Sequence, residues 1–159
     1  MKSIITRLLL AGLFAWTTGL VAATAAQAAE LKLRSQLVWG TDGSKPEGKD
    51  LVELDAKLKE KLKAFRWKNY WVIKSQDTRV DGKEPRVAML DKCAVALSDV
   101  GDGHIQVKLS SVGKDGKLKL LRTVTEPISK LDKGGTLIIG GDSKETWDDA
   151  WMVIITISH

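Results

Sequence analysis

The feature that most restricts how this chain can fold is a series of short alternating segments separated by glycine-rich turns. In residues 104–112 (HIQVKLSSV), isoleucine, valine and leucine alternate with glutamine and lysine, which is typical of a strand with one buried face. The following Asp115-Gly116 pair favours a hairpin turn. Further strands are predicted over residues 31–39, 69–76, 86–97, 117–124, 135–141 and 150–158.

One segment has the spacing of an amphipathic helix instead. From Leu51 to Phe65, apolar residues recur three or four positions apart. Asp50, with a glutamate three residues later, has the arrangement of a capping box. Basic residues gather towards the end of the segment, where they suit the helix dipole. We therefore predict a helix that begins at Asp50 and ends between Arg66 and Asn69.

Together these elements predict an α+β fold. We expect one amphipathic helix packed on a single curved antiparallel sheet, in strand–helix–meander order, with about six to seven strands. The sequence has no internal repeat, low-complexity tract or linker that would indicate a second domain. Residues 29–159 are therefore predicted to form a single domain.

The first 28 residues have the pattern of a secretory signal peptide. Lys2 and Arg7 form a basic front, residues 8–23 are largely apolar, and Ala26-Gln27-Ala28 is a small-x-small cleavage site. The alternative is an uncleaved anchor, although threonine and glycine lower the apolarity of the run. We expect cleavage after Ala28, no membrane span afterwards, and a periplasmic or secreted location.

Charge and cysteine content narrow the possible partners. Loss of Lys2 and Arg7 with the leader lowers the formal net charge from +5 to +3, a mild excess that does not indicate nucleic acid as a partner. Cys93 is the only cysteine, so it has no internal disulfide partner. A buried position on a strand suits it best; an intermolecular disulfide is the main alternative.

Residues 43–50 (GSKPEGKD) match the spelling of a phosphate-binding loop, but not its chemistry. Pro46 removes a backbone donor, Glu47 brings negative charge, and Asp50 stands where a serine or threonine would bind magnesium. We interpret the segment as a connector between a strand and the helix.

No other cluster has the composition of a catalytic or metal site. Asp99, Asp102 and His104 offer only two carboxylates and one imidazole, and the glycines around them favour a hairpin turn. There is no nucleophile elbow and no H-E-x-x-H motif. We expect no catalytic residues, no metal ligands and no cofactor, although sequence alone does not exclude an enzyme.

Tryptophans are the most unusual feature of residues 29–159. Trp71 and Trp151 lie within apolar runs and suit core packing between helix and sheet. Trp39 and Trp147 lie beside polar loops, where an exposed ring could stack on a sugar or anchor a protein. Trp39 and Trp147 are therefore the candidate ligand- or partner-binding residues.

Three short motifs resemble those of small, uncharacterised secreted bacterial proteins. They are W-G-T (39–41), F-R-W-K-N-Y (65–70) and L-I-I-G-G-D (137–142). This resemblance implies a shared fold and export, and brings no activity with it. Residues 36–40 (QLVWG) also resemble the Q-x-V-x-G inhibitory hairpin of cystatins, but that hairpin follows the helix in cystatins and the match precedes the predicted helix in this chain.

These observations favour a non-catalytic module of the cell envelope that binds another envelope or secreted protein. Long predicted strands support this hypothesis, because a sheet edge can accept an added strand. A carbohydrate or cell-wall binder that uses exposed tryptophans is the main alternative, and a small secreted inhibitor or hydrolase is a third possibility.

Overall fold

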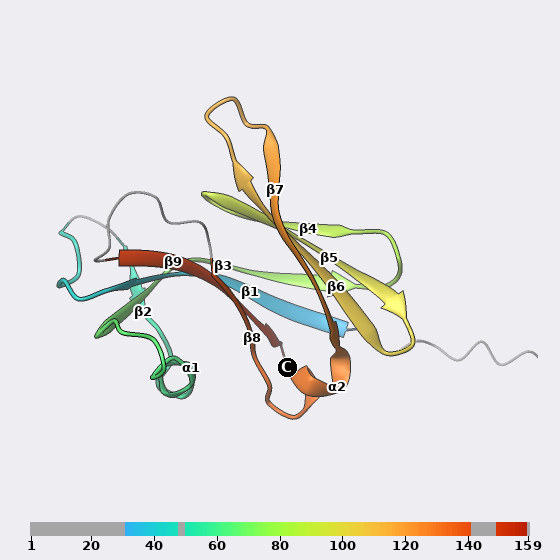
Figure 1. Ribbon diagram of the computed structural model, residues 1–159, viewed down its shortest axis with the longest axis horizontal. Helices are drawn as coiled ribbons and strands as arrows, with labels where there is room; N and C mark the ends of the chain where they lie inside the picture. Colours follow the sequence, from blue (N-terminus) through green and yellow to red (C-terminus); the bar gives the residue numbers. More distant parts are fainter. Residues whose placement is uncertain (1–30, 48–49, 141–148, 159) are drawn as a thin grey trace, which may run out of the picture.

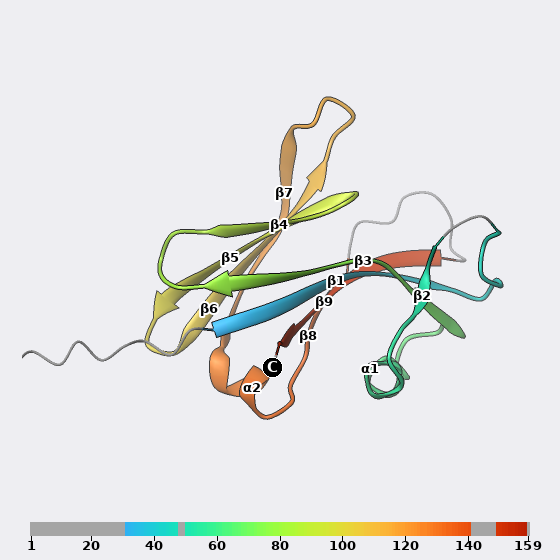
Figure 2. The same ribbon diagram turned by 180° about the vertical axis from the view of Figure 1, so that it is seen from behind.

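The computed structural model describes residues 31–47, 50–140 and 149–158, which form two antiparallel sheets and two short helices (Figures 1 and 2). The five-stranded sheet has the order β2-β3-β1-β9-β8, and the four-stranded sheet has the order β4-β5-β6-β7. In chain order the elements are β1 (Leu31–Thr41), β2 (Val52–Glu53), α1 (Ala56–Lys61), β3 (Asn69–Val80), β4 (Arg86–Leu90), β5 (Cys93–Gly101), β6 (His104–Val112), β7 (Leu118–Pro127), α2 (Ile128–Asp132), β8 (Leu137–Gly140) and β9 (Asp149–Ile157).

The predicted α+β composition with antiparallel strands is confirmed, but the prediction of a single curved sheet with one helix is wrong. The chain leaves the five-stranded sheet at the end of β3 and starts the four-stranded sheet with β4. At this corner the side-chain oxygen of Gln76 accepts a hydrogen bond from the Met89 N–H (3.1 Å), although β3 and β4 belong to different sheets. Two layers form because a lone sheet with one short helix would leave an apolar face in water.

The layer between the sheets is an aliphatic core. The alternation predicted for β6 is confirmed, since Ile105, Val107 and Leu109 are all fully buried. Burial of each such side chain contributes about 1.5–3 kcal/mol to folding. The other members are Leu33, Leu37, Val80, Ala88, Leu90, Cys93, Val95, Leu97, Leu131, Ile139, Val153 and Ile155.

The first helix begins later than predicted. Asp55 caps α1, because its Oδ1 accepts a hydrogen bond from the Lys57 N–H (2.9 Å). Asp50 is therefore not the cap. The residues between them include β2, in which Val52 and Glu53 pair with β3. Pairing with a neighbouring strand thus overrides the helical periodicity of this segment.

The same helix also ends earlier than predicted. Leu62 is the C-cap, and its N–H donates to the carbonyls of Leu58 (3.2 Å) and Lys59 (2.9 Å). Phe65 N–H then donates to the Leu62 carbonyl (2.9 Å), which continues the chain as turns rather than helix. Within the described ranges, no helix has both the length and the apolarity to cross a membrane.

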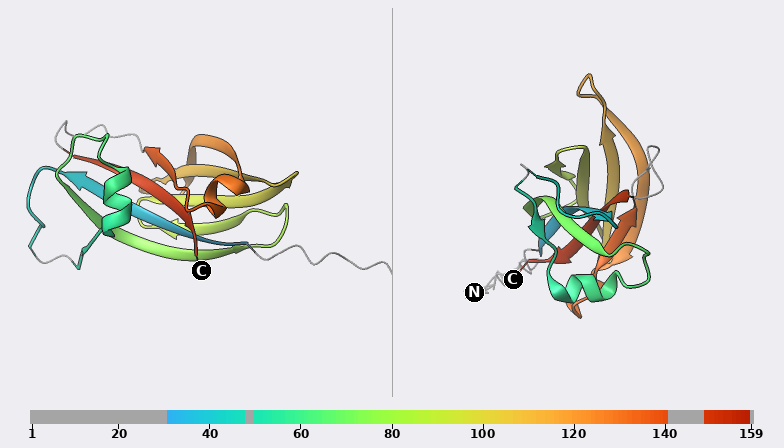
Figure 3. Two further views of the ribbon diagram at one scale, coloured as in Figure 1. Left: turned by 90° about the horizontal axis from the view of Figure 1, so that it is seen from below. Right: turned by 90° about the vertical axis from the view of Figure 1, so that its left-hand side faces the viewer.

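A smaller core lies on the other face of the five-stranded sheet, under α1 (Figure 3). The predicted apolar spacing is correct in part, since Leu54 and Leu62 are buried in this core and Leu58 packs against it, whereas Phe65 is 41% exposed. Tyr70 donates a hydrogen bond from its hydroxyl to the Leu62 carbonyl (3.2 Å) and so joins β3 to the end of α1. The remaining buried members are Val38, Met152 and Ile154.

Candidate functional site

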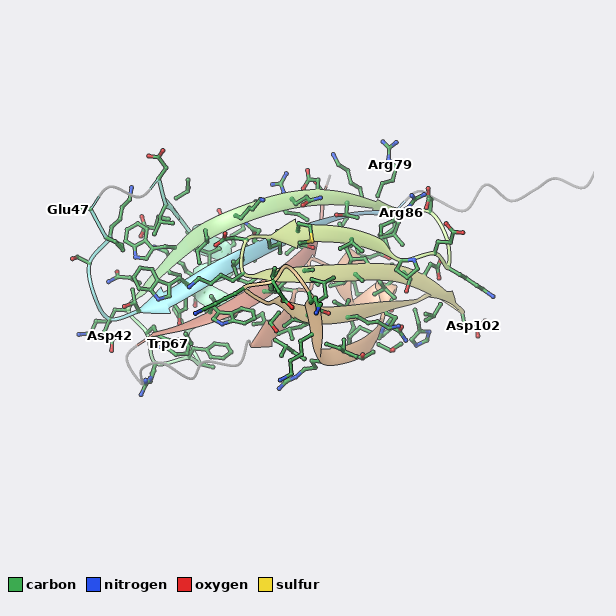
Figure 4. The ribbon with its side chains drawn as sticks, turned by 90° about the horizontal axis from the view of Figure 1, so that it is seen from above. Asp42, Glu47, Trp67, Arg79, Arg86 and Asp102 are labelled. Carbon is green, nitrogen blue, oxygen red and sulfur yellow. The ribbon has the colours of Figure 1, made fainter. Side chains whose placement is uncertain are left out.

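Every aromatic side chain in the described part of the chain lies at one end of the five-stranded sheet. Residues 72–140 contain no phenylalanine, tyrosine or tryptophan, so the four-stranded sheet is built without them. Figure 4 shows Trp67 at this end with Asp42 and Glu47, far from Arg79 and Asp102. We call this region the aromatic end; its members are Trp39, Phe65, Trp67, Tyr70, Trp71 and Trp151.

Three of these tryptophans form a ladder across neighbouring strands. Trp39 on β1 is directly opposite Trp71 on β3 and directly opposite Trp151 on β9. Residues directly opposite each other share a face, so all three lie on the face that bears the inter-sheet core, against which Trp151 packs. With neighbouring strands about 4.8 Å apart, the ladder spans about 10 Å.

The ladder lies near the end of the sheet that extends beyond its partner. Figures 1 and 3 show the last residues of β1 and the first residues of β3 and β9 reaching past the four-stranded sheet. All three tryptophans are partly exposed, whereas the aliphatic core residues further along the same strands are buried. The ladder therefore extends the inter-sheet core towards solvent.

Trp67 covers the opposite face of the same sheet. A Cβ atom built on Gly40 would lie 2.9 Å from Trp67 Cε3 and 3.2 Å from Tyr70 Cε1. Gly40 thus leaves the space that the Trp67 ring occupies, while its neighbour Trp39 faces the other side. The W-G-T and F-R-W-K-N-Y segments therefore meet at the aromatic end.

Hydrogen bonds also join the F-R-W-K-N-Y segment to the two residues that follow W-G-T. The Lys68 N–H donates to Asp42 Oδ1 (3.0 Å), and the Asn69 side-chain amide donates to the Gly43 carbonyl (2.8 Å). Burial raises the pKa of Tyr70, and the negative charge of Asp42 adds to the effect. Gly43, the first residue of the phosphate-loop match, therefore helps to anchor a strand end, while Gly48 and Lys49 lie outside the described residues.

The outermost part of the aromatic end combines two aromatic rings with a cation. Phe65 is 41% exposed and stacks on Trp67, with ring centroids 6.2 Å apart and planes inclined by 14°. The Arg66 guanidinium lies 5.7 Å from the centroid of the Trp67 ring. Such a cation–π contact contributes about 0.5–1 kcal/mol at an exposed position. This group is the most accessible part of the aromatic end.

Of the two tryptophans predicted to bind a ligand or partner, the structure describes only Trp39. Trp39 is the central member of the ladder and so belongs to the aromatic end. Trp147 lies outside the described residues. Sequence reasoning missed Phe65 and Arg66, for which the signal was the aromatic–cation–aromatic run at residues 65–67.

The other sequence candidates form ordinary structural elements. Asp102 and Gly103 have positive φ angles (52° and 70°) in a tight turn between β5 and β6, as predicted. His104 Nδ1 lies 2.9 Å from the Asp102 carbonyl oxygen in that turn. No group of three or more His, Cys, Asp or Glu side chains within the described ranges is arranged to hold a metal. The Q-x-V-x-G match lies within β1, which is paired on both sides, so it does not form a hairpin.

Cys93 occupies the buried strand position that was predicted as its best-suited environment. Its side chain is fully buried at the start of β5. Burial raises the pKa of the thiol to about 12, and the negative charge of Asp91 adds to the shift. A thiol in this environment stays protonated and therefore unreactive at neutral pH.

Comparisons with protein-family models, with curated proteins and with solved structures find no match for this chain.

Proposed function

We propose that this chain is a non-catalytic protein-binding module of the cell envelope, and that the aromatic end is its binding surface. The observation that carries the proposal is the concentration of all six described aromatic residues at one end of one sheet. Packing alone does not require this arrangement, because the four-stranded sheet forms its core from aliphatic residues. An envelope location rests on the leader-like residues 1–28.

The chemistry of the aromatic end suits a protein partner. Tryptophan, tyrosine and arginine are the residue types that dominate binding energy at protein interfaces. Here Arg66 lies over Trp67 beside the exposed Phe65. Lys68 adds a second exposed cation. The complementary surface would carry apolar side chains together with carboxylates.

Affinity capture followed by titration tests this proposal. Tagged protein covering residues 29–159 would be crosslinked in envelope extract, and the captured protein identified, purified and titrated by calorimetry. The Phe65→Ala/Arg66→Ala double variant should bind at least tenfold more weakly. Val100→Ala is the matched control, because Val100 is 42% exposed on β5, and its affinity should stay within twofold. Equal binding by the double variant and wild type would contradict the proposal.

The tryptophan ladder favours a second candidate function, binding of an envelope glycan. Aromatic faces at regular spacing across strands suit stacking against successive sugar rings. Soluble peptidoglycan fragments should then change tryptophan emission of the wild type, and Trp39→Phe should weaken the change while Phe65→Ala leaves it intact. Emission that stays constant under saturating fragments removes this candidate.

A further inference from the structure

The outer strand of the four-stranded sheet offers a second interaction surface. β7 is ten residues long and lies at the edge of its sheet, with β6 on one side only. Figure 1 shows the β6–β7 hairpin projecting away from the rest of the molecule, and Figure 3 shows it rising beyond the other strands. An edge of this length presents unpaired backbone groups to solvent.

The hairpin geometry identifies which backbone groups face outward. Gly113 N–H donates to the Lys117 carbonyl (2.8 Å) and Gly116 N–H donates to the Gly113 carbonyl (2.9 Å), so residues 113 and 117 form the closing hydrogen-bonded pair. Gly116 has the positive φ (75°) that this turn requires. Hydrogen-bonded and non-hydrogen-bonded pairs alternate along an antiparallel ladder. The N–H and C=O groups of Leu118 and Leu120 therefore point away from β6, towards the open edge.

The side chains beside these backbone groups are apolar and accessible. Leu118 is 51% exposed and Leu120 is 56% exposed. On the face of the sheet that points away from the inter-sheet core, directly opposite residues form a row across the four strands. This row runs from Leu120 on β7 through Ser110 and Ala94 to the exposed Met89 on β4. A strand added beside β7 would continue this row and cover Leu120.

The charge of the edge restricts which strand can be added. Lys119 and Arg122 are exposed on β7 and have no ion pair among the described residues. The charged residues on either side of them, Lys117 and Glu126, already have ion-pair partners. Lys117 pairs with Asp115 (3.3 Å), and Glu126 pairs with Lys130 (2.6 Å). A second copy of this chain would bring the same cations to the same edge, and like charges on adjacent strands destabilise pairing. The edge therefore rejects self-association and favours an acidic strand.

We propose that the open edge of β7 binds an extended segment of another protein in which apolar and acidic residues alternate. The segment adds a fifth strand to this sheet through the outward N–H and C=O groups of Leu118 and Leu120. Its apolar side chains cover the two leucines, and its carboxylates pair with Lys119 and Arg122. This surface lies in the four-stranded sheet, whereas the aromatic end lies in the five-stranded sheet, so this proposal does not depend on the function proposed above.

Fluorescence anisotropy with two labelled peptides tests the charge requirement. One probe is a ten-residue peptide of alternating valine and glutamate, and the other replaces each glutamate with lysine. The wild-type chain should bind the acidic peptide at least tenfold more tightly than the basic one. Lys119→Glu/Arg122→Glu should reverse this preference. Absence of acidic-peptide binding, or equal affinity for both peptides, would overturn the proposal.

A matched pair of variants tests the backbone contribution. Leu120→Pro removes the outward N–H at an edge position where proline does not interrupt the β6–β7 ladder. Leu120→Ala removes the same side chain but keeps the N–H. The proline variant should lose at least a further fivefold in affinity relative to the alanine variant, with circular dichroism confirming that both are folded. Equal affinities would show that the peptide binds through side chains alone and would overturn strand addition.

Discussion

Substitution of Gly40 by alanine probes the contact on which the aromatic end depends. The new Cβ would lie 2.9 Å from Trp67 Cε3 and 3.1 Å from Trp67 Cδ2, whereas carbon atoms pack best at about 3.5–4.0 Å. The ring must therefore move by roughly 0.6 Å or more, although it is stacked on Phe65. Overpacking of this kind costs about 1–3 kcal/mol in the free energy of unfolding.

Urea unfolding followed by circular dichroism measures this cost, and Gly140→Ala supplies the control. Gly140 is also on a strand, but a Cβ there meets nothing within 4 Å, so its substitution should be neutral or stabilise by up to about 1 kcal/mol. In a Trp67→Ala background, Gly40→Ala should cost less, because the clashing ring is absent and only the 3.2 Å approach to Tyr70 Cε1 remains. An equal cost of Gly40→Ala in both backgrounds would refute the proposed packing of Trp67 over Gly40.

Three further predictions concern other parts of the fold. Hydrogen bonding from Arg34 holds the pKa of Asp77 at about 2, so this ion pair stabilises the fold above the ordinary carboxyl pKa and the stabilisation is lost as the pH falls towards 2. Wild type should lose about 1 kcal/mol more stability than Asp77→Asn between about pH 5 and pH 2 in urea titrations, after allowance for solvent screening. Cys93 should react with a thiol reagent only as fast as the protein unfolds; rapid labelling of the native state would contradict its burial. Leu62→Ala should lower the free energy of unfolding by about 2–5 kcal/mol, because Leu62, at the end of α1, is fully buried in the smaller core; a loss below about 1 kcal/mol would show that this core contributes little.

Much of the strand content could be predicted because alternation and turn chemistry act locally. The buried face of β6 follows directly from its period of two, and the hairpin at residues 113–117 follows from the glycine at position 116, which adopts positive φ. These signals depend on residues close together in the chain.

The division into two sheets could not be predicted, because alternation indicates a buried face without indicating what covers it. The strands β3 and β4 are consecutive and each has the pattern of a half-buried strand, yet they belong to different sheets. Helix boundaries were wrong for a related reason. Leu54 lies between β2 and α1, and Leu62 directly follows α1, yet both face the same small core. Their spacing therefore fits the observed structure as well as the longer helix that was predicted.

The tryptophan ladder was equally inaccessible from sequence. Trp39, Trp71 and Trp151 are far apart in the chain, and their alignment depends on the register of three strands. That register includes an irregularity between Leu37 and Val38, which no local pattern indicated. The position of the Trp67 ring over Gly40 likewise depends on how the turn after α1 packs against the sheet.

Hydrogen–deuterium exchange on the complex with the captured partner is the most direct test of the aromatic end as the binding surface. Peptides that cover residues 62–71 should exchange more slowly when the partner is bound, whereas exchange in β6, which lies in the other sheet, should stay unchanged. Protection elsewhere on the chain, with residues 62–71 exchanging at the rate of the free protein, would contradict binding at the aromatic end.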